Sequence, residues 1–494
     1  MAIGMTIQQG AAIFNEIAAQ ATGRKDLGNV DATNFVSIAE TVLRTGTDPL
    51  MGAISQVLTK TIVSVRPYYA KFKGLRRDSE KWGNHIRKLV IIDSDAVDND
   101  SFKLEAGEPV PDQWDYRPAK TLQTNYYGQD TYADYVSIPV MQLNTAFESL
   151  AGFTAWISGV MQNIEDRFTQ RQESADRLCI ANMVAAKTIS DSRNVYNLLT
   201  LYYQRTGHYL TPETYAGSQY YDDFCKWLSA FIKTLSRAFE DRTTLRHANV
   251  TIDGVAFDIP RHTPKADQHL YLYSPEMNDA EARVLADTFN PELAKIGDFE
   301  KVNFWQSSTP GKEMSIKVKP EYIDESGEST SSSDYITIDN LFGILFDTEA
   351  MGVTDIYKSI RMTPINARTE HYDVHWHLNQ RYYNDLTENC AVLLLAQTEE
   401  DPSYMHISPD ELTVKVGGSG VINVTHPQSS VTATVDTTAA ADGVTASYSS
   451  GKVTVAVAGT ASVESATVTI TDGTTTYTVS VTIEAAAEAK RAKK

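Results

Sequence analysis

Cysteine is scarce in this chain of 494 residues: Cys179, Cys225 and Cys390 are the only three, and they lie far apart. No CxxC pair occurs, so we expect neither a disulfide framework nor a structural zinc site, and a reducing compartment fits best. The first residues, MAIGMTIQQG, lack the basic region and apolar run of a secretory signal. No stretch comes near the ~18 uninterrupted apolar residues of a membrane span. These absences predict a protein that folds in the cytosol and enters no membrane.

The common catalytic and nucleotide-binding motifs are also missing. HExxH and GxSxG do not occur. TPGKEMS contains Gly311-Lys312, but the residue five positions before Gly311 is Gln306, where a phosphate-binding loop needs a glycine. GGSGVI lacks the third glycine of a dinucleotide-binding loop. Asp and Glu are so numerous that their spacing singles out no catalytic pair. We therefore expect no enzyme and no cofactor.

Positive charge is in short supply, with 44 Lys and Arg against 63 Asp and Glu and a formal net charge of −19. A general DNA-binding surface needs the opposite balance, because its contacts neutralise phosphates. Contact with nucleic acid through a local patch stays open. The acidic excess favours solubility and resists adhesion to polyanions. The basic tail, residues 485–494, either contacts DNA or an acidic surface or is simply solvated.

Apolar and aromatic residues are plentiful, at 42% and 10% of the chain, which is enough for large cores. Length alone suggests about two to four domains. Residues 1–75 carry short helical patterns at 32–44 and 50–62, and such an arm needs a surface to lie against. Strand-like runs at 88–92 and 132–141 flank a long acidic segment, and we expect them to be the arms of an extended hairpin. An isolated hairpin is marginal in water, so a partner surface is implied.

The longest helical pattern covers residues 145–188. Its apolar stripe follows the helical period through Leu150, Phe153, Ile157, Val160, Ile164, Phe168 and Leu178. A helix of about 40 residues is roughly 60 Å long. We expect it to be the spine of a flat or elongated body.

Residues 218–345 indicate an α+β region. Its first helix has an apolar face that we expect to be core, formed by Phe224, Trp227, Leu228, Phe231, Leu235 and Phe239. A hairpin is expected at 250–259, and a strand that runs into a helix capped by Ser274 follows it. Residues 324–334 are expected to be a solvated loop, and strands return over 336–395.

Composition changes sharply after residues 397–405. From 406 to 484 the chain has no Phe or Trp, and Lys occurs only at 415 and 452. Runs with period-two alternation, such as Val453-Val455-Val457, are joined by glycine-bearing turns. This pattern predicts a small β-sandwich.

One segment raises a question of metal chemistry. TEHYDVHWHLNQRYYNDLTENC, residues 369–390, puts on one face of a strand the polar side chains His371, Asp373, His375 and His377. Alternate positions lie roughly 7 Å apart, too far for neighbouring side chains to share a metal without strong bending. We interpret the face as the polar side of a sheet, with a metal site or a pH-responsive contact as alternatives. Cys390, which precedes AVLLL, is expected to be a buried apolar cysteine.

The order of these parts resembles the major capsid protein of tailed bacteriophages, the Hong Kong 97 fold, of the phi 29 podovirus kind. YLYSPEMNDAEARVLADTFNPELAKIG, followed by VNFWQS, looks like the strand and helix of the capsid axial domain. LFDTEAMGVTDIYKSIRMTPINARTEHYDVHWHLNQRYYNDLTENCAVLLL resembles the return through the peripheral domain. DELTVKVGGSGVINVT and the strands after it resemble bacterial Ig-like group 2 domains, although Tyr448 stands where those usually have Trp.

The resemblance implies an α+β fold of the Hong Kong 97 type plus a C-terminal Ig-like β-sandwich. Its parts would be an N-terminal arm at 1–75, an extended loop at 76–140, a peripheral domain with the spine helix at 141–215 and 345–395, an axial domain at 216–344, an Ig-like domain at 406–484 on the outside of the shell, and the basic tail at 485–494.

The implied function is structural. Copies would assemble into the pentamers and hexamers of an icosahedral or prolate shell around the phage dsDNA genome, in the host bacterial cytoplasm. Implied partners are other copies, scaffolding and portal proteins, and packaged dsDNA by weak non-specific contact. The Ig-like domain would bridge neighbouring capsomers or bind host surface glycans. Two competing hypotheses are a surface adhesin, against which the missing signal peptide counts, and a carbohydrate-active enzyme, which would need a carboxylate pair in a pocket.

Overall fold

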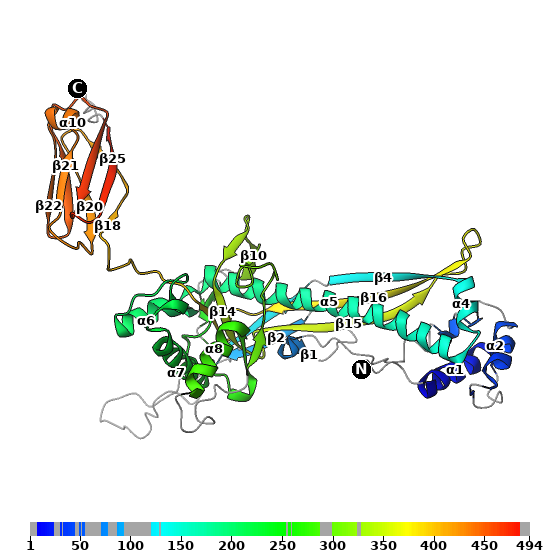
Figure 1. The fold of residues 1–494 in the computed structure, drawn as a ribbon. Coiled ribbons are helices and arrows are strands. Elements are labelled where there is room, and N and C mark those ends of the chain that lie inside the picture. The colour runs from blue at the N-terminus through cyan, green and yellow to red at the C-terminus, as the bar shows by residue number, and fades with distance from the viewer. Residues whose placement is uncertain are drawn as a thin grey trace, which may run out of the picture. The chain divides into compact units, whose positions relative to one another are not determined.

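The computed structural model divides the chain into two compact units, Met1–Leu198 with Gln219–Leu395, and Leu199–Ser218 with Ala396–Lys494 (Figure 1). The residues that the structure describes are 7–23, 30–31, 33–44, 49–50, 52–54, 71–77, 86–92, 120–127, 130–252, 255–257, 259–286, 299–323 and 328–484. No helix in this part of the chain is long and apolar enough to cross a membrane.

The first unit contains a four-stranded sheet of order β1-β15-β16-β4. Its strands are β1 (Arg76–Arg77), β15 (Met351–Met362), β16 (His371–Asn384) and β4 (Asp130–Pro139). The long helix α5 (Leu150–Ser190) runs along this sheet (Figure 1). The buried side chains of β16, including Tyr372 and Trp376, belong to the core that α5 shares. Alternation along β16 therefore gives one apolar face and one polar face, as predicted.

The predicted spine helix is confirmed, with one error in its apolar stripe. A short helix, α4 (Val140–Ala146), precedes α5, and Ser149 caps α5 by accepting a hydrogen bond from the Gly152 backbone N–H at 3.0 Å. Leu150, Phe153, Ile157 and Phe168 are buried, but Leu178 is 56% exposed. A step of 28 residues at 3.6 per turn places Leu178 about 80° away from Leu150. Val160 and Ile164 lie outside the described side chains.

Two arm helices pack on the start of the spine: α1 (Ile7–Thr22), which the sequence pattern did not predict, and α2 (Phe35–Arg44), which lies within the helix expected at 32–44. Phe14 of α1 has its ring centroid 4.6 Å from Phe35, 5.6 Å from Phe147 and 5.2 Å from Phe153. Burial of such aromatic rings dominates a local core. The surface that these arm residues need is therefore supplied by their own chain.

A second, five-stranded sheet of order β5-β17-β14-β8-β9 lies in the same unit. Its strands are β5 (Val195–Asn197), β17 (Cys390–Leu394), β14 (Leu341–Asp347), β8 (Gln268–Tyr273) and β9 (Glu300–Val302). Every residue of β14 and β17 is buried, including Cys390 as expected. The domain boundary expected between 344 and 345 falls inside β14, so this sheet joins segments that the resemblance assigned to two domains.

The helices beside this sheet are α7 (Tyr221–Glu240) and α8 (Ser274–Ala286). Strand β8 runs directly into α8 at Ser274, as predicted. Most of the predicted α7 face is buried, while Trp227 and Phe231 are half-buried and stack on each other at 5.2 Å. Short 3-10 turns are η1 (Lys73–Leu75), η3 (Ser192–Asn194), η4 (Tyr215–Gly217) and η5 (Lys265–Asp267).

Four two-stranded pairs also lie among the described residues of the first unit: β2 (Ile86–Ile92) with β3 (Lys120–Tyr126), β6 (Val250–Ile252) with β7 (Val255–Phe257), β10 (Ile316–Val318) with β13 (Ile336–Ile338), and β11 (Glu321–Ile323) with β12 (Ser329–Ser331). The hairpin expected at 250–259 is confirmed. The loop expected at 324–334 is wrong in part, because β12 lies within it.

The pairing expected for the extended hairpin is also wrong. Strand β2 pairs with β3 in the register Ile86↔Tyr126, and the run at 132–141 contributes instead to β4, which pairs with β16. Strand β3 and the run at 132–141 are both short strand-like segments that follow β2, so the sequence alone did not show which of them pairs with β2.

The second unit contains helix α6 (Leu198–Thr206), of which all but the first residue falls in it, and the β-sandwich. One sheet has the order β18-β20-β23-β22 and the other β19-β25-β24-β21. Their strands are β18 (His406–Ser408), β19 (Glu411–Lys415), β20 (Ser419–Thr425), β21 (Thr432–Val435), β22 (Val444–Ser449), β23 (Lys452–Val457), β24 (Ser465–Thr471) and β25 (Thr476–Glu484), with helix α10 (Thr437–Ala441) between β21 and β22. The two inner faces share one aliphatic core that includes Val453, Val468 and Val479. The predicted sandwich is confirmed.

Candidate assembly surface

The β2–β3 hairpin exposes two large aliphatic side chains on its outer face. Leu89 and Ile91 of β2 are 63% and 67% exposed, and Gln123 and Thr121 lie opposite them on β3. A two-stranded element is marginal in water by itself, and a patch of neighbouring exposed aliphatic side chains is a candidate contact surface. The outer face of the hairpin, defined by Arg87, Leu89 and Ile91, is therefore a candidate contact surface.

The inner face of the hairpin carries a lysine that enters a cluster of acidic side chains. The Lys88 Nζ lies 2.9 Å from Asp385 Oδ2 and 3.2 Å from Glu349 Oε2, and it also donates a hydrogen bond to Glu388 Oε1. Arg261 Nη1 lies 2.8 Å from the same Glu388 oxygen. The side chains of Asp385 and Glu388 are 0% and 6% exposed, so the cluster is buried.

Burial and neighbouring charges shift the pKa values in this ionic cluster. Burial raises the pKa of Glu388 to about 7, against the opposing effects of Lys88 and Arg261. Burial also acts to raise the pKa of Asp385, but Lys88 and hydrogen bonds from Thr387 outweigh it and leave that pKa below its ordinary value. Burial acts to lower the pKa of Lys88, and Asp385 and Glu388 outweigh it, so Lys88 stays charged.

This cluster was not predicted from the sequence. The signals for it were a single lysine at an inward position of the apolar run KLVII and two acidic residues in NDLTEN immediately before an apolar strand. Asp385 and Glu388 lie in the turn between β16 and β17, where only partners from elsewhere in the chain can neutralise them.

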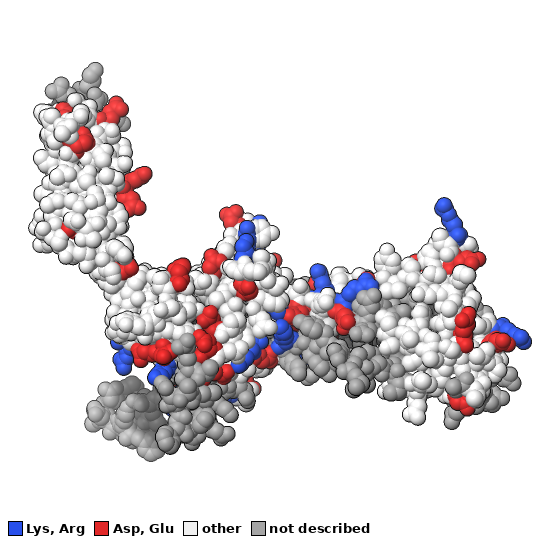
Figure 2. Space-filling model, in the orientation of Figure 1, with Lys and Arg blue, Asp and Glu red and all other residues white. Residues whose placement is uncertain are grey.

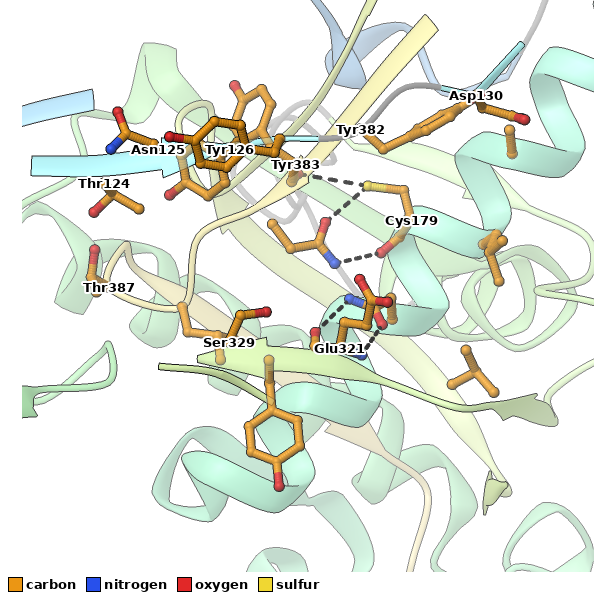
Figure 3. Close-up of a pocket in the computed structure, with 18 of the residues that line it drawn as sticks. Thr124, Asn125, Tyr126, Asp130, Cys179, Glu321, Ser329, Tyr382, Tyr383 and Thr387 are labelled. Carbon is orange, nitrogen blue, oxygen red and sulfur yellow. Dashed lines mark hydrogen bonds between the residues drawn. The ribbon is translucent and has the colours of Figure 1, made fainter. Parts of the chain in front are cut away.

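A groove of about 820 Å³ lies between β3, the middle of α5, the end of β16 and the β11–β12 hairpin (Figure 3). Tyr127 and Leu178 line it and are 69% and 56% exposed. The Cys179 Sγ contacts Asn384 Oδ1 at 2.9 Å, which ties α5 to β16 at the groove. Asn182 exchanges two hydrogen bonds with the Glu321 backbone, at 3.0 and 2.8 Å, and ties α5 to β11. The walls are thus fixed, and exposed apolar side chains remain between them.

The structure places the predicted histidine face on the solvent side of the β16 sheet. The rings of His375 and His377 stack at 6.2 Å, Tyr135 of β4 stacks on His375 at 5.4 Å, and His371 Nε2 lies 3.6 Å from Asp373 Oδ1. All four predicted residues are partly exposed. Within the described ranges, no group of three or more His, Cys, Asp or Glu side chains is arranged to hold a metal ion.

Charge on the face drawn in Figure 2 is mixed in the first unit, where Lys and Arg alternate with Asp and Glu. The charged side chains visible on the sandwich are acidic. A continuous basic stripe of the kind that binds nucleic acid is not present among the described residues on this face.

A model of one protein family matches most of the sequence. The Phi29-like phage major capsid protein model covers residues 11–394, which include the hairpin, the spine, both sheets of the first unit and the groove. The chain belongs to this family. It is a structural protein of a phage capsid shell, it is located in the virion, and it assembles with other copies into that shell. The capsid prediction is confirmed, and nothing supports the adhesin alternative.

Three solved phage structures show a distant likeness to this chain. The capsid of Staphylococcus phage Andhra has 11% identity and a TM-score of 0.43, covering 66% of this chain and 84% of that one. A chain from the head fiber and inner core protein structure of bacteriophage P68 has 9% identity and a TM-score of 0.41, covering 68% and 87%. The capsid of cyanophage P-SCSP1u has 10% identity and a TM-score of 0.38, covering 69% and 91%. No curated protein matches the chain. The family assignment rests on the family model, which ends before the sandwich.

Proposed function

We propose that this capsid protein has the Hong Kong 97-type architecture and assembles as pentamers and hexamers chiefly through its extended loop, residues 76–140. The observation that carries the proposal is the exposed aliphatic pair Leu89 and Ile91 on a two-stranded hairpin. In a ring of identical copies, such a face meets a different surface of the next copy, and rotation closes the ring. The groove beside β3 and α5 supplies a second apolar surface on the same chain.

We propose the parts expected from the sequence, with one change. These parts are the arm 1–75, the extended loop 76–140, the peripheral domain 141–215 and 345–395, and the axial domain 216–344. The five-stranded sheet favours moving residues 390–394 and all of β14 to the axial part. Pentamers and hexamers use the same surfaces at different angles, and a loop that reaches out from a fixed body absorbs that difference better than a packed core does.

The test is the double substitution Leu89→Ser with Ile91→Ser. Neither side chain belongs to the buried core, so the unassembled protein should melt as the wild type does. Removing two aliphatic side chains from a contact costs about 1.5–3 kcal/mol each when both are buried there. The concentration needed to form shells should rise at least tenfold, measured by sedimentation and electron microscopy. Leu245→Ser, another exposed leucine of the first unit, is the matched control. Shells of the double variant at wild-type concentration would refute the role of the hairpin.

For residues 406–484 we propose an Ig-like domain on the outside of the shell that bridges capsomers or binds host surface glycans. Its separate aliphatic core supports removal as a unit. Particles that lack 406–494 and melt at a lower temperature would support bridging. Particles of normal stability with weaker adsorption to host cells would support glycan binding. Particles unchanged in both respects would contradict the proposal.

The remaining partners follow from a structural role. We propose that scaffolding and portal proteins take part in assembly in the host cytoplasm, that packaged dsDNA makes only weak contact with this acidic chain, and that the protein catalyses no reaction. The net charge of −19 supports a wall along which DNA can slide. Co-sedimentation of linear dsDNA with the purified protein should be weak and should vanish at moderate salt.

A further inference from the structure

The acidic cluster that receives Lys88 is part of a rigid turn. Both the Thr387 backbone N–H and its hydroxyl donate to Asp385 Oδ1, at 2.9 and 2.6 Å, and the Asp385 N–H donates to the Ala350 carbonyl at 2.6 Å. One carboxylate oxygen of Asp385 is therefore satisfied within the turn, and the other faces Lys88. The acceptor is oriented by its own segment before Lys88 contributes anything.

The same turn is connected to three further parts of the first unit. The Leu386 carbonyl accepts hydrogen bonds from the Ala248 N–H at 2.9 Å and from Lys187 Nζ, near the end of α5, at 3.2 Å. The Thr387 carbonyl accepts one from Arg261 Nε at 3.1 Å. The turn is thus held by the spine and by the segments around 248 and 261. A group bound to it is bound to the body of the unit as a whole.

The other inward side chains of the hairpin are mostly apolar or aromatic among its described residues. Leu122 is buried, Ile86 and Val90 are half-buried, and Tyr126 packs on Tyr383 with ring centroids 5.4 Å apart and has its buried hydroxyl beside Asp385. On β2 the outward side chains are exposed, and Lys88 is the inward side chain with directional bonds to the body. Because Lys88 directly precedes Leu89 on the strand, its bonds fix the direction in which Leu89 and Ile91 point.

We propose that Lys88 is a positioning residue for capsid assembly: its ammonium group, bound between Asp385 and Glu388, holds the outward face of the β2–β3 hairpin at the orientation that contacts the next copy. The inference rests on the proposed role of that hairpin in assembly. It assigns to Lys88 no contact with the neighbour. The residue acts through the direction of Leu89 and Ile91.

The charges around Lys88 favour such a role. Two cations, Lys88 and Arg261, balance the buried carboxylates of Asp385 and Glu388, with Glu349 at the exposed rim. Withdrawal of Lys88 leaves two buried carboxylates with one cation, which is strongly unfavourable. Hairpin orientations that keep Lys88 in the cluster are therefore favoured over those that do not.

The test compares Lys88→Met, which keeps the aliphatic length and removes the charge, with Lys88→Arg, which keeps the charge. Lys358→Met, which removes the charge of an exposed lysine on β15 outside the hairpin, is the matched control. We expect Lys88→Met to raise the shell-forming concentration at least tenfold and to speed amide hydrogen exchange at 86–92 and 120–126 at least tenfold. Exchange in 390–394 should stay unchanged. Lys88→Arg should restore both properties largely, and Lys358→Met should leave both as in the wild type.

Because Lys88→Met leaves two buried acids, the double variant Lys88→Met with Glu388→Gln provides a second measurement. It removes one uncompensated charge, so folding should recover while assembly stays impaired. Normal assembly of this double variant, or exchange that rises equally throughout the first unit in Lys88→Met, would overturn the positioning role. If the Leu89→Ser, Ile91→Ser protein fails to assemble but Lys88→Met assembles normally, only the inference fails. If the serine variant assembles normally, the proposed function of the hairpin fails first.

Discussion

Replacing Gly10 by alanine should destabilise this protein, although alanine is the better helix former. Gly10 lies in α1 where that helix contacts α5, and a Cβ there would overlap Thr154 Oγ1 and lie 2.9 Å from Thr154 Cβ. Thr154 is buried and its hydroxyl donates to the Leu150 carbonyl at 2.7 Å. Threonine in a helix has only two favoured χ1 rotamers, so this buried side chain has little freedom to turn away from Gly10. The helices would have to separate.

The magnitude follows from two opposing effects. Alanine gains about 1 kcal/mol over glycine inside a helix. Overpacking of a buried contact costs typically 1–3 kcal/mol, and here separation also loosens Phe14 against Phe153. We expect a net loss of about 1 kcal/mol. Gly159 is the matched control, because it is exposed on α5 and a Cβ added there would meet no atom within 4 Å, so Gly159→Ala should gain about 1 kcal/mol.

The assay is urea unfolding of the unassembled protein, followed by circular dichroism, together with hydrogen exchange in residues 7–22. Gly10→Ala should unfold at lower urea than the wild type, and Gly159→Ala at higher urea. Adding Thr154→Ala to Gly10→Ala should recover part of the loss, since it removes the overlapping oxygen. A Gly10→Ala protein as stable as the Gly159→Ala protein would refute the close approach of α1 to α5.

Three further predictions concern buried titratable groups. Burial raises the pKa of Asp176, which lies 2.9 Å from Arg76, to about 7, so its contribution to stability is present at low pH and is lost as pH rises from about 4 to 7; Asp176→Asn should flatten that part of the melting profile. Burial lowers the pKa of His247 to about 4, so stability falls as pH drops from 6.5 to about 4, and His247→Gln should remove this loss in the same melting series. All three cysteines are buried, so iodoacetamide should label Cys179, Cys225 and Cys390 only on unfolding; labelling of the native protein would contradict their burial.

The spine helix and the sandwich were predictable because their patterns repeat over many residues. The error at Leu178 arose because a stripe extended over 28 residues accumulates the difference between the assumed and the true helical period. Strand β16 was predictable for a similar reason. Polar and apolar side chains alternate from His371 to Leu378, so the apolar ones all lie on the buried face of the sheet and the polar ones on the other face.

The hairpin and the ionic cluster were not predictable from local pattern. Strands β3 and β4 lie close together in the chain, so either could have paired with β2. Strand β4 pairs with β16 instead, and its Tyr132 and Val136 pack against the core. The bond between Lys88 and Asp385 joins residues 297 positions apart. A lone lysine in an apolar run gives no local indication of which distant residue it pairs with.

The packing of the arm changes where the free energy of assembly must come from. The sequence suggested that the arm and the extended loop both need neighbouring copies for burial. In the described residues, the apolar faces of α1 and α2 are covered by the start of α5 in the same chain, and Ile7 and Val36 are the large apolar side chains of these helices left exposed. This part of the arm can therefore fold before any contact between copies forms.

Assembly then depends on surfaces that stay uncovered in the folded chain, among which the hairpin face presents the two large aliphatic side chains of Leu89 and Ile91. A lattice that relies on one short hairpin for contact needs that hairpin to be oriented in advance, because ordering it during association would consume part of the contact free energy. On the proposed role of the hairpin, a buried anchor such as Lys88 meets this need.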